Sequence, residues 1–156
     1  MTSLASEVIH KLSGKTLATA ESCTGGMIGQ LLTGVSGASK VYKGGVISYT
    51  NEVKQNVLGV DGKLLAELGA VSAPVAQAMA AGARKVLNAD ISVSVTGLAG
   101  PDGDEFGNPV GTVFLGYASE THSEAVACYF EGDREAVRQQ AAEAALVLIL
   151  ANKEHL

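Results

Sequence analysis

The chain of 156 residues carries 16 acidic and 11 basic residues, so its formal net charge is −5, and only 4% of its residues are aromatic. This balance argues against a nucleic-acid partner, because such proteins rely on dense positive charge and aromatic stacking. The length fits one domain, and we expect residues 1–156 to form a single domain whose core needs no metal or disulfide.

The first third of the chain predicts two pairs of a helix and a strand. Apolar residues at helical spacing predict a helix over residues 3–12, and a short segment at 15–20 predicts a strand. A second helix is expected from residue 25 to about residue 34. A second strand is expected over 41–50, where two adjacent glycines mark a bulge or a point of close approach.

The middle of the chain predicts three helices in succession. A short helix follows the second strand over residues 51–60. Asp61 is expected to cap a helix over 62–68, and Ser72 is expected to cap a longer helix over 73–87. These caps fit because their side-chain oxygens can accept hydrogen bonds from the free N–H groups of a first helical turn.

The last third predicts three strands and a long helix. Alternating β-branched residues predict a strand over 90–96, and a glycine-rich loop follows at 97–109. Strands over 110–119 and 124–131 form a hairpin, and an amphipathic helix covers 133–151. This order predicts an α/β protein in which helices cover both faces of a five-stranded mixed sheet.

The cysteines and the apolar runs predict the compartment. The chain has two cysteines, Cys23 and Cys128, and residues 1–12 lack a run of signal-peptide type. These features favour reduced thiols and a cytoplasmic location. The longest apolar run, residues 144–151, is far below the ~20 residues that span a bilayer, so we expect no membrane partner.

Three polar or glycine-rich segments follow predicted strands, at residues 21–26, 48–54 and 96–103. In open α/β sheets, ligands bind in crevices beyond the carboxyl ends of the strands. We therefore expect a binding or catalytic site where these three segments meet.

The first of these segments lies at a predicted helix N-terminus. Free N–H groups near Ser22, Cys23 and Thr24 would stabilise a phosphate or the oxyanion of an attacked amide, and Gly25 and Gly26 would allow a ligand to approach closely. The simpler alternative is that a hydroxyl of this segment only caps the helix. The adjacent carboxylate has no assigned role.

A hydroxyl nucleophile needs a base, and the histidines do not supply one. His10, His122 and His155 are expected far from the strand ends, which argues against a Ser-His-Asp triad. Lys54 is the candidate base, with Tyr49 as a proton donor or a wall of the site, because burial can lower a lysine pKa. The alternative is that Lys54 is a solvated helix charge.

Other candidates complete the predicted site. Thr96, Gly97 and Gly100 give an amide-rich loop, although a plain turn is the alternative. Arg134 and Arg138 share one helical face and suit a phosphate, although surface ion pairs would explain them equally well. Cys23 ranks second to Ser22 as nucleophile, and no ligand spacing for a metal is present.

Taken together, six stretches resemble the CinA C-terminal domain family, whose stand-alone members are nicotinamide-nucleotide amidases (PncC type). They lie between residues 19 and 141, so the resemblance covers nearly the whole chain. The stretches, in chain order, are TAESCTGG, GGVISYTNEVKQNVLGV, GAVSAPVA, VTGLAGPDG, PVGTVFLG and GDREAVRQQA.

The resemblance implies a fold and a reaction. The fold is a three-layer α/β/α sandwich with a five-stranded mixed sheet, here in its stand-alone form and assembled as a homo-oligomer. The reaction is hydrolysis of the carboxamide of nicotinamide mononucleotide to nicotinate mononucleotide and ammonia, without metal or cofactor, in cytoplasmic pyridine-nucleotide salvage. The partner implied is therefore a small-molecule nucleotide substrate.

Family roles fall on matching residues of this chain. Ser22 matches the family serine, Lys54 the family lysine and Tyr49 the family tyrosine, and these three are the expected catalytic residues. We expect the substrate to contact Cys23, Thr24, Gly25, Gly26, Thr96, Gly97, Gly100 and Arg138.

Two departures from the family pattern fall in one loop, and two alternatives stay open. Asp104 stands where the family usually has glycine, and Asn108 stands where lysine is frequent, which bears on ligand contacts of that loop. The segment at 22–26 can hold the phosphate while another group attacks. The chain can also be a non-catalytic nucleotide-binding or regulatory module of the same fold.

Overall fold

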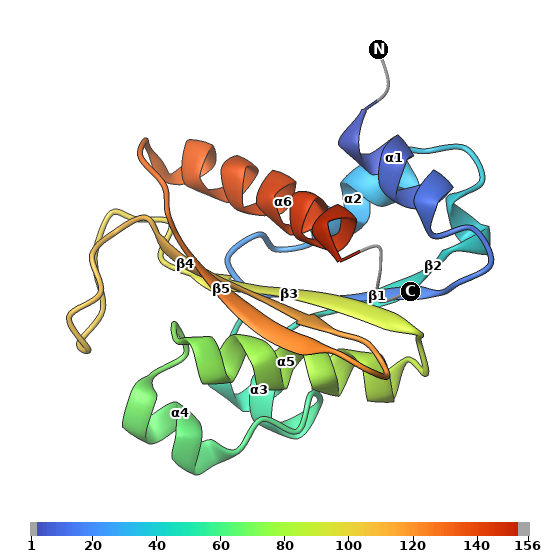
Figure 1. Ribbon diagram of the computed structural model, residues 1–156. Coiled ribbons are helices and arrows are strands. Elements are labelled where there is room, and N and C mark those ends of the chain that lie inside the picture. The colour runs from blue at the N-terminus through green and yellow to red at the C-terminus, as the bar shows by residue number, and fades with distance from the viewer. Residues whose placement is uncertain (1–2, 153–156) are drawn as a thin grey trace.

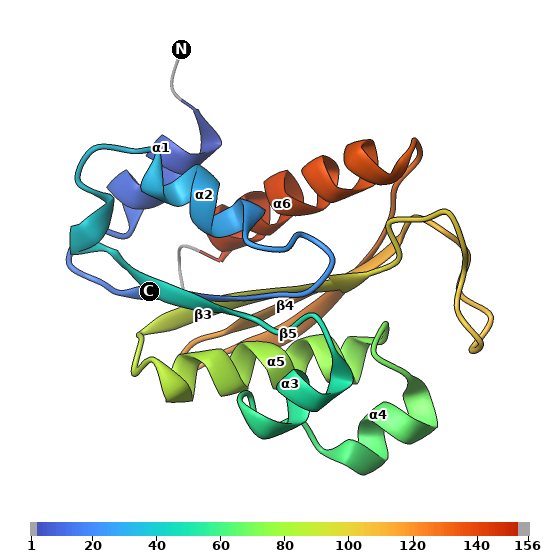
Figure 2. The same ribbon diagram turned by 180° about the vertical axis from the view of Figure 1, so that it is seen from behind.

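A five-stranded mixed sheet lies between two layers of helices in the computed structural model, which describes residues 3–152 (Figure 1). Helices α1, α2 and α6 cover one face, and α3, α4 and α5 cover the other, as the view from behind also shows (Figure 2). The predicted α/β/α sandwich is confirmed. His155 lies outside the described residues.

The helices and strands fall close to the predicted ranges. In chain order they are α1 (Leu4–Lys11), β1 (Leu17–Glu21), α2 (Met27–Thr33), the 3₁₀ helix η1 (Ala38–Lys40), β2 (Tyr42–Ile47), α3 (Asn51–Asn56), α4 (Gly62–Leu68), α5 (Ala73–Val86), β3 (Ile91–Gly97), β4 (Thr112–Ala118), β5 (Ser123–Tyr129) and α6 (Arg134–Ala151).

The strand order β2-β1-β3-β4-β5 brings the expected segments together. Strand β1 pairs in parallel with both β2 and β3, so Glu21 lies opposite Ile47 on one side and Val95 on the other. The carboxyl ends of these three strands therefore share one edge of the sheet, from which the segments at 21–26, 48–54 and 96–103 emerge. The last two strands are antiparallel and close the sheet.

Apolar cores form on both faces of the sheet. One core joins the sheet to α1, α2 and α6 through residues such as Val8, Val93 and Leu146. The other packs α5 and the α3–α4 region against β1. Strand β3 presents small serines toward α5, and Ser92 and Ser94 donate hydrogen bonds to main-chain carbonyls of that helix. These hydrogen bonds tie β3, in the middle of the sheet, to α5.

Three local details differ from the predictions or sharpen them. Helix α2 begins at Met27 rather than residue 25, because Gly25 and Gly26 have φ of 59° and 110° and form a turn. Ser72 is the N-cap residue of α5, but its hydroxyl donates to Gly69 instead of capping. The 3₁₀ helix η1 was not predicted.

Strand β2 has both features that its glycine pair indicated. Its pairing with β1 skips a residue between Tyr42 and Gly44, which is a bulge. At Gly45, a Cβ atom would clash with the Thr19 hydroxyl of β1. Glycine at this position therefore allows the two strands to approach, and it fixes the register that carries β2 to the edge of the site.

Candidate functional site

Ser22 is the first residue beyond β1 and is held in place by the sheet. Its N–H group donates to the Val95 carbonyl at 3.0 Å, which continues the pairing of β1 with β3 by one residue. Its side chain is buried to 8% exposure, at the edge of a cavity. The hydroxyl is thus fixed by main-chain geometry and reached from one side.

Lys54 comes from α3 and points its ammonium group at Ser22. Thr50 caps this helix by accepting from the Val53 N–H group, which places Lys54 on the inner face. Its Nζ donates to Ser22 Oγ at 3.0 Å, to the Ser48 carbonyl at 2.7 Å and to the Tyr49 carbonyl at 3.5 Å. The side chain is 1% exposed, so Lys54 is not a solvated surface charge.

Burial changes the protonation of Lys54. Desolvation by burial lowers the pKa of Lys54 from 10.5 to about 8, and the nearby Cys23 opposes this shift only in part. About one tenth of the molecules then carry a neutral amine at neutral pH. A neutral amine 3.0 Å from a serine hydroxyl can accept its proton.

The same pKa predicts how stability depends on pH. Below pH 8 Lys54 is charged in both the folded and the unfolded protein. The free-energy cost of removing this charge from water then lowers the stability of the folded protein. Folding releases a proton between pH 8 and 10.5, so wild-type stability gains with rising pH in that window. Relative to Lys54→Met, the free energy of unfolding of wild type should rise by up to about 3 kcal/mol between pH 8 and 10.5.

Urea unfolding of both proteins from pH 7 to 10.5 checks this expectation. The matched control is Lys63→Met, because Lys63 is an exposed helical lysine with 78% of its side chain accessible. A stability difference between wild type and Lys54→Met that does not change with pH would contradict the assigned burial effect.

Cys23 is buried beside the pair and is poorly suited to attack. Burial raises the pKa of its thiol to about 11, so the reactive thiolate is scarce at neutral pH. Its carbonyl accepts from Arg138 Nε at 2.9 Å. The geometry therefore favours Ser22 over Cys23 as the nucleophile.

The turn after Ser22 does not open to the cavity as expected. The Thr24 hydroxyl and the Gly26 N–H group both donate to the Glu21 carboxylate, and Gly25 N–H donates to the Ser22 carbonyl. Thr24 is fully buried. These three residues therefore do not line the cavity, and the Glu21 carboxylate, which accepts from Thr24 and Gly26, had no predicted role.

A cavity of about 350 Å³ lies in front of Ser22 and Lys54. The expected residues Cys23, Tyr49, Thr96, Gly97 and Gly100 contribute to its wall, whereas Thr24, Gly25, Gly26 and Arg138 do not. The full lining is Ser22, Cys23, Tyr49, Asn51, Lys54, Ala70, Val71, residues 96–102 and Arg134.

The two arginines of α6 have different contacts, and Arg138 does not line the cavity. Arg138 lies behind the turn, where it donates to the Cys23 carbonyl and, at 3.2 Å, to the Thr24 carbonyl. Arg134 lines the cavity and donates to the Gly100 carbonyl at 2.6 Å and to the Tyr49 hydroxyl at 3.1 Å. Arg134 is therefore the arginine of α6 that lines the cavity.

Thr96 and Gly97, at the end of β3, have structural contacts as well as a place in the cavity wall. The Thr96 hydroxyl donates to the Ala70 carbonyl at 2.8 Å, so it is engaged although Thr96 lines the cavity. A Cβ atom at Gly97 would lie 2.6 Å from Val113 Cγ2, so glycine is required there. The Gly97 position lets the chain turn over the cavity without pushing β4 away.

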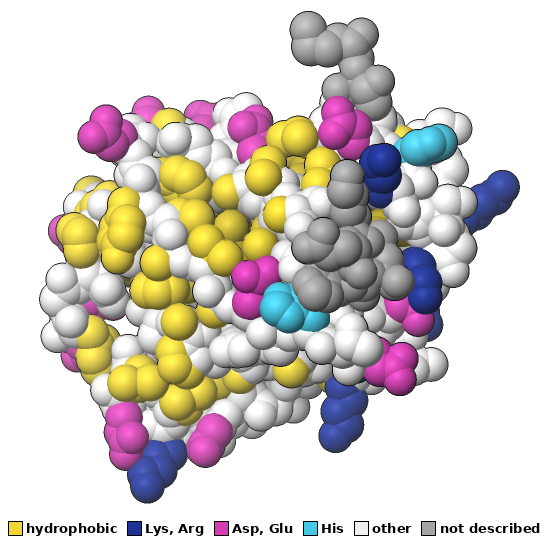
Figure 3. Space-filling view, viewed as in Figure 1, with side chains coloured by type: hydrophobic (Ala, Val, Ile, Leu, Met, Phe, Trp, Pro, Cys, Tyr) yellow, Lys and Arg dark blue, Asp and Glu magenta, His cyan; other side chains and the backbone are white. Residues whose placement is uncertain are grey.

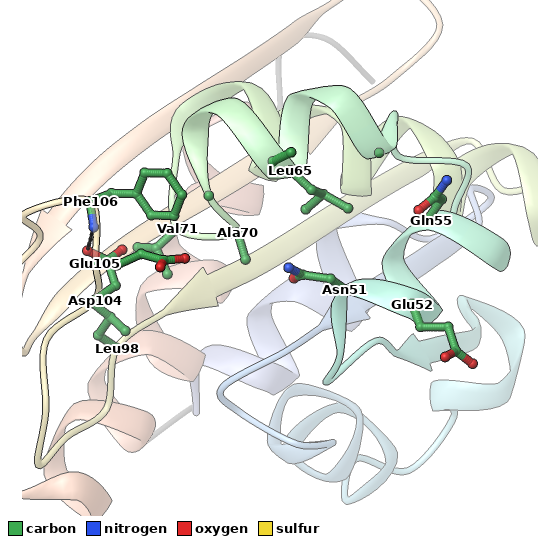
Figure 4. A pocket seen from close by; sticks show the side chains of 13 residues that line it. Asn51, Glu52, Gln55, Leu65, Ala70, Val71, Leu98, Asp104, Glu105 and Phe106 are labelled. Carbon is green, nitrogen blue, oxygen red and sulfur yellow. Dashed lines mark hydrogen bonds between the residues drawn. The ribbon is translucent and has the colours of Figure 1, made fainter.

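A second cavity of about 530 Å³ adjoins the first and shares Asn51, Ala70, Val71 and Leu98 with it. Figure 4 shows α3 on one side of this space, with Glu52 and Gln55, and the 104–106 loop on the other, with Phe106 and two acidic side chains. Its acidic wall disfavours a phosphate, because like charges repel.

The two departures from the family pattern bond to each other. The Asp104 carboxylate accepts from the Asn108 N–H group at 2.9 Å and from its Nδ2 at 2.8 Å. Asn108 Nδ2 also donates to the Val71 carbonyl. Together they close the 104–108 loop over the second cavity, away from Ser22 and Lys54.

Residues 3–152 offer neither a membrane-spanning helix nor a metal-binding cluster. No helix in that range is long and apolar enough to cross a membrane. No group of three or more His, Cys, Asp and Glu side chains in the same range is arranged to hold a metal ion.

The protein is an α/β/α sandwich in which Ser22 and the buried Lys54 meet at the carboxyl edge of a mixed sheet. The model of the CinA C-terminal domain matches residues 1–152, and the chain belongs to this family. The fold agrees with solved structures of the CinA superfamily.

One such structure, from Klebsiella pneumoniae, is 36% identical with a TM-score of 0.95 and covers 98% of this chain and 97% of that one. Another, from Escherichia coli, is 36% identical with a TM-score of 0.92 and covers 94% and 87%. A CinA-like protein of Anaeromyxobacter dehalogenans is 52% identical over 136 residues, which is 87% of this chain and 33% of that protein. The chain thus spans about a third of such curated relatives.

Proposed function

We propose that the protein hydrolyses the carboxamide of nicotinamide mononucleotide to nicotinate mononucleotide and ammonia. The observation that carries the proposal is the 3.0 Å contact between Ser22 Oγ and the Nζ atom of a buried lysine whose pKa is lowered to about 8. The resemblance of the sequence to nicotinamide-nucleotide amidases supplies the substrate. A cavity of about 350 Å³ in front of the pair has the size of a small-ligand site.

In the first step, neutral Lys54 accepts the Ser22 hydroxyl proton while Oγ bonds to the carboxamide carbon. The carbonyl electron pair moves to its oxygen, which needs N–H donors. The Cys23 and Gly100 N–H groups are candidates, because both residues line the cavity and neither group donates a main-chain hydrogen bond within residues 3–152.

In the second step, the carbon–nitrogen bond breaks and Lys54 returns its proton to the leaving nitrogen, which departs as ammonia. A water molecule then attacks the acyl-serine ester, and Lys54 takes the water's proton. The ester bond breaks, Ser22 regains a proton from Lys54, and nicotinate mononucleotide leaves. Lys54 thus serves as base and acid in turn, as a pKa near the working pH allows.

Tyr49 has a supporting place in this scheme. Its hydroxyl accepts from Arg134 rather than from Ser22 or Lys54, and its side chain is 59% exposed. Only its main-chain carbonyl contacts Lys54. We therefore propose that Tyr49 forms a wall of the cavity and fixes Arg134, while proton transfer belongs to Lys54.

Arg134 is our candidate for the substrate phosphate. Among the described residues that line the first cavity, Arg134 and Lys54 are the two cations, and Lys54 is engaged with Ser22. Arg134→Ala should raise KM for nicotinamide mononucleotide about tenfold or more, with a smaller change in kcat.

The phosphate contact is isolated by comparing two substrates. Nicotinamide riboside lacks the phosphate, so Arg134→Ala should reduce the preference of the enzyme for the nucleotide over the riboside. Arg134→Lys keeps the charge and should lose less. An unchanged preference in Arg134→Ala would exclude this arginine from phosphate binding.

The assay that tests the proposed function is ammonia release from nicotinamide mononucleotide by the purified protein. Stoichiometric ammonia and nicotinate mononucleotide are expected. Binding of the nucleotide without ammonia release would favour the second candidate, a non-catalytic nucleotide-binding or regulatory module. The buried, intact Ser22–Lys54 contact favours the enzyme, since a lysine is costly to bury without a use.

The proposal extends to assembly and location. We propose a cytoplasmic homo-oligomer in pyridine-nucleotide salvage. Figure 3 shows hydrophobic side chains gathered over the region that β5 and α6 occupy in Figure 1. Tyr129 on β5 is 71% exposed and Val147 on α6 is 50% exposed, and such exposed apolar side chains on these two elements support a contact surface.

A further inference from the structure

We infer that Glu21 is a positioning residue that supplies an internal anion to the turn after Ser22 and thereby fixes the nucleophile. The same contact engages the N–H groups at the start of α2 that the substrate phosphate would need, so the turn serves the reaction through the position of Ser22. The effect on rate rests on the proposed amidase function, whereas the anion contact can be tested without it.

Glu21 makes a dense set of contacts for one side chain. It is the last residue of β1 and is 2% exposed. Its Oε1 atom accepts from Thr24 Oγ1 at 2.7 Å, from Ile28 N at 2.9 Å and from Gly26 N at 3.2 Å. Its Oε2 atom accepts from Gly29 N at 3.1 Å. Four donors from the turn and the first turn of α2 thus converge on one carboxylate.

These contacts explain both the buried acid and the turn. A buried carboxylate needs several hydrogen bonds to replace water, and no salt-bridging cation accompanies Glu21 among residues 3–152. Helix α2 needs an acceptor for its first N–H groups, and its N-cap residue Gly26 has no side chain to provide one. The Glu21 carboxylate therefore supplies acceptors to the first N–H groups of α2, and these N–H groups replace the water that the buried carboxylate has lost.

The opposite side of the turn is held by Arg138. This arginine donates to the Cys23 and Thr24 carbonyls, while Glu21 accepts from the N–H side. Ser22 lies between Glu21 and this doubly held turn, and its Oγ must stay 3.0 Å from Lys54 Nζ. Small displacements of a nucleophile reduce rates strongly, so loss of Glu21 should act through Ser22.

The arrangement also decides between two uses of the turn. A phosphate bound there would need N–H donors, and those of Gly26, Ile28 and Gly29 already bond to Glu21. It would also lie against a buried negative charge, which repels it. Arg134 also lines the cavity, and its hydrogen bonds go to the Gly100 carbonyl and the Tyr49 hydroxyl rather than to a carboxylate.

The test removes the internal anion and then returns it in solution. Glu21→Ala should lower kcat for nicotinamide mononucleotide about 100-fold, while KM changes less than about threefold. Sodium formate, compared with sodium chloride at equal ionic strength, should restore kcat at least about tenfold by filling the vacated carboxylate position. Formate should also raise the Tm of Glu21→Ala and leave the Tm of wild type unchanged.

Two variants complete the design. Asp61→Ala is the matched control, because Asp61 caps α4 through the Lys63 N–H group and lies away from the turn. It should lose stability, keep kcat and show no activation by formate. Glu21→Gln keeps the shape but has one acceptor oxygen, so it should lower kcat at preserved KM without formate activation, and it carries the test if Glu21→Ala does not fold.

The outcomes separate the two proposals. An active wild type with unchanged kcat in both Glu21 variants would overturn the positioning role alone. A higher KM in place of a lower kcat would assign Glu21 to substrate binding and also overturn it. If wild type releases no ammonia, the amidase proposal fails, and the Tm response of Glu21→Ala to formate still decides whether the turn is an anion cradle filled by Glu21.

Discussion

Ser22→Ala should lower kcat for ammonia release from nicotinamide mononucleotide by at least about 10³-fold while the nucleotide still binds. The hydroxyl is the only part of Ser22 removed, and its main-chain bond to Val95 stays. Lys54 loses one hydrogen-bond acceptor but keeps the Ser48 carbonyl at 2.7 Å, so the fold should be preserved. Steady-state ammonia release, with nucleotide binding measured by calorimetry, checks the expected separation of binding from turnover.

The neighbouring thiol provides the discriminating comparison. Cys23→Ala should lower kcat less than about tenfold, because burial keeps its thiol protonated, with a pKa of about 11. If Cys23 were the nucleophile, the two variants would exchange their effects. Near wild-type turnover by Ser22→Ala would therefore refute the nucleophile assignment, whatever the wild-type rate.

Lys54→Met should lower kcat by about 10³-fold, and wild-type turnover should rise with pH through a pKa of about 8. The base must be neutral, and the neutral fraction of Lys54 grows from about one tenth at pH 7 to about nine tenths at pH 9. Activity should therefore fall about tenfold for each pH unit below 7. Methionine fills a similar volume without an amine, so it removes the base with little loss of packing.

A pH–rate profile of kcat/KM measures the apparent pKa of the free enzyme. The control is Lys63→Met, whose exposed lysine lies on α4 and should leave the profile unchanged. A profile that is flat from pH 6 to 9, or one that falls with rising pH, would contradict the role of Lys54 as a neutral base.

The sequence was sufficient for most of the fold because its signals are local. Helical spacing, turn glycines and capping residues such as Asp61 and Asp133 fall at the observed element ends. The strand order depends on long-range pairing, which no local pattern encodes. Even so, the rule that polar segments gather at the carboxyl ends of parallel strands correctly brought Ser22 and Lys54 together.

The arrangement of the site differs from the expected one where side chains compete for the same hydrogen-bond partners. Free N–H groups were predicted at the start of α2, whereas Glu21 turns back and accepts hydrogen bonds from them. An acidic residue just before a turn whose N-cap position is Gly26 is the signal that would have found it. Arg134 and Arg138 share a helical face, and only tertiary contacts decide that Arg138 lies behind the turn.

The central claim is that Ser22, activated by Lys54, forms an ester with the substrate acyl group. Acid quenching of wild type during its first turnover of nicotinamide mononucleotide, followed by peptide mapping with mass spectrometry, tests this most directly. We expect a hydroxylamine-sensitive nicotinate mononucleotide adduct on Ser22, absent from Ser22→Ala. An adduct on Cys23, or full-rate ammonia release by Ser22→Ala with no adduct on any residue, would contradict the claim.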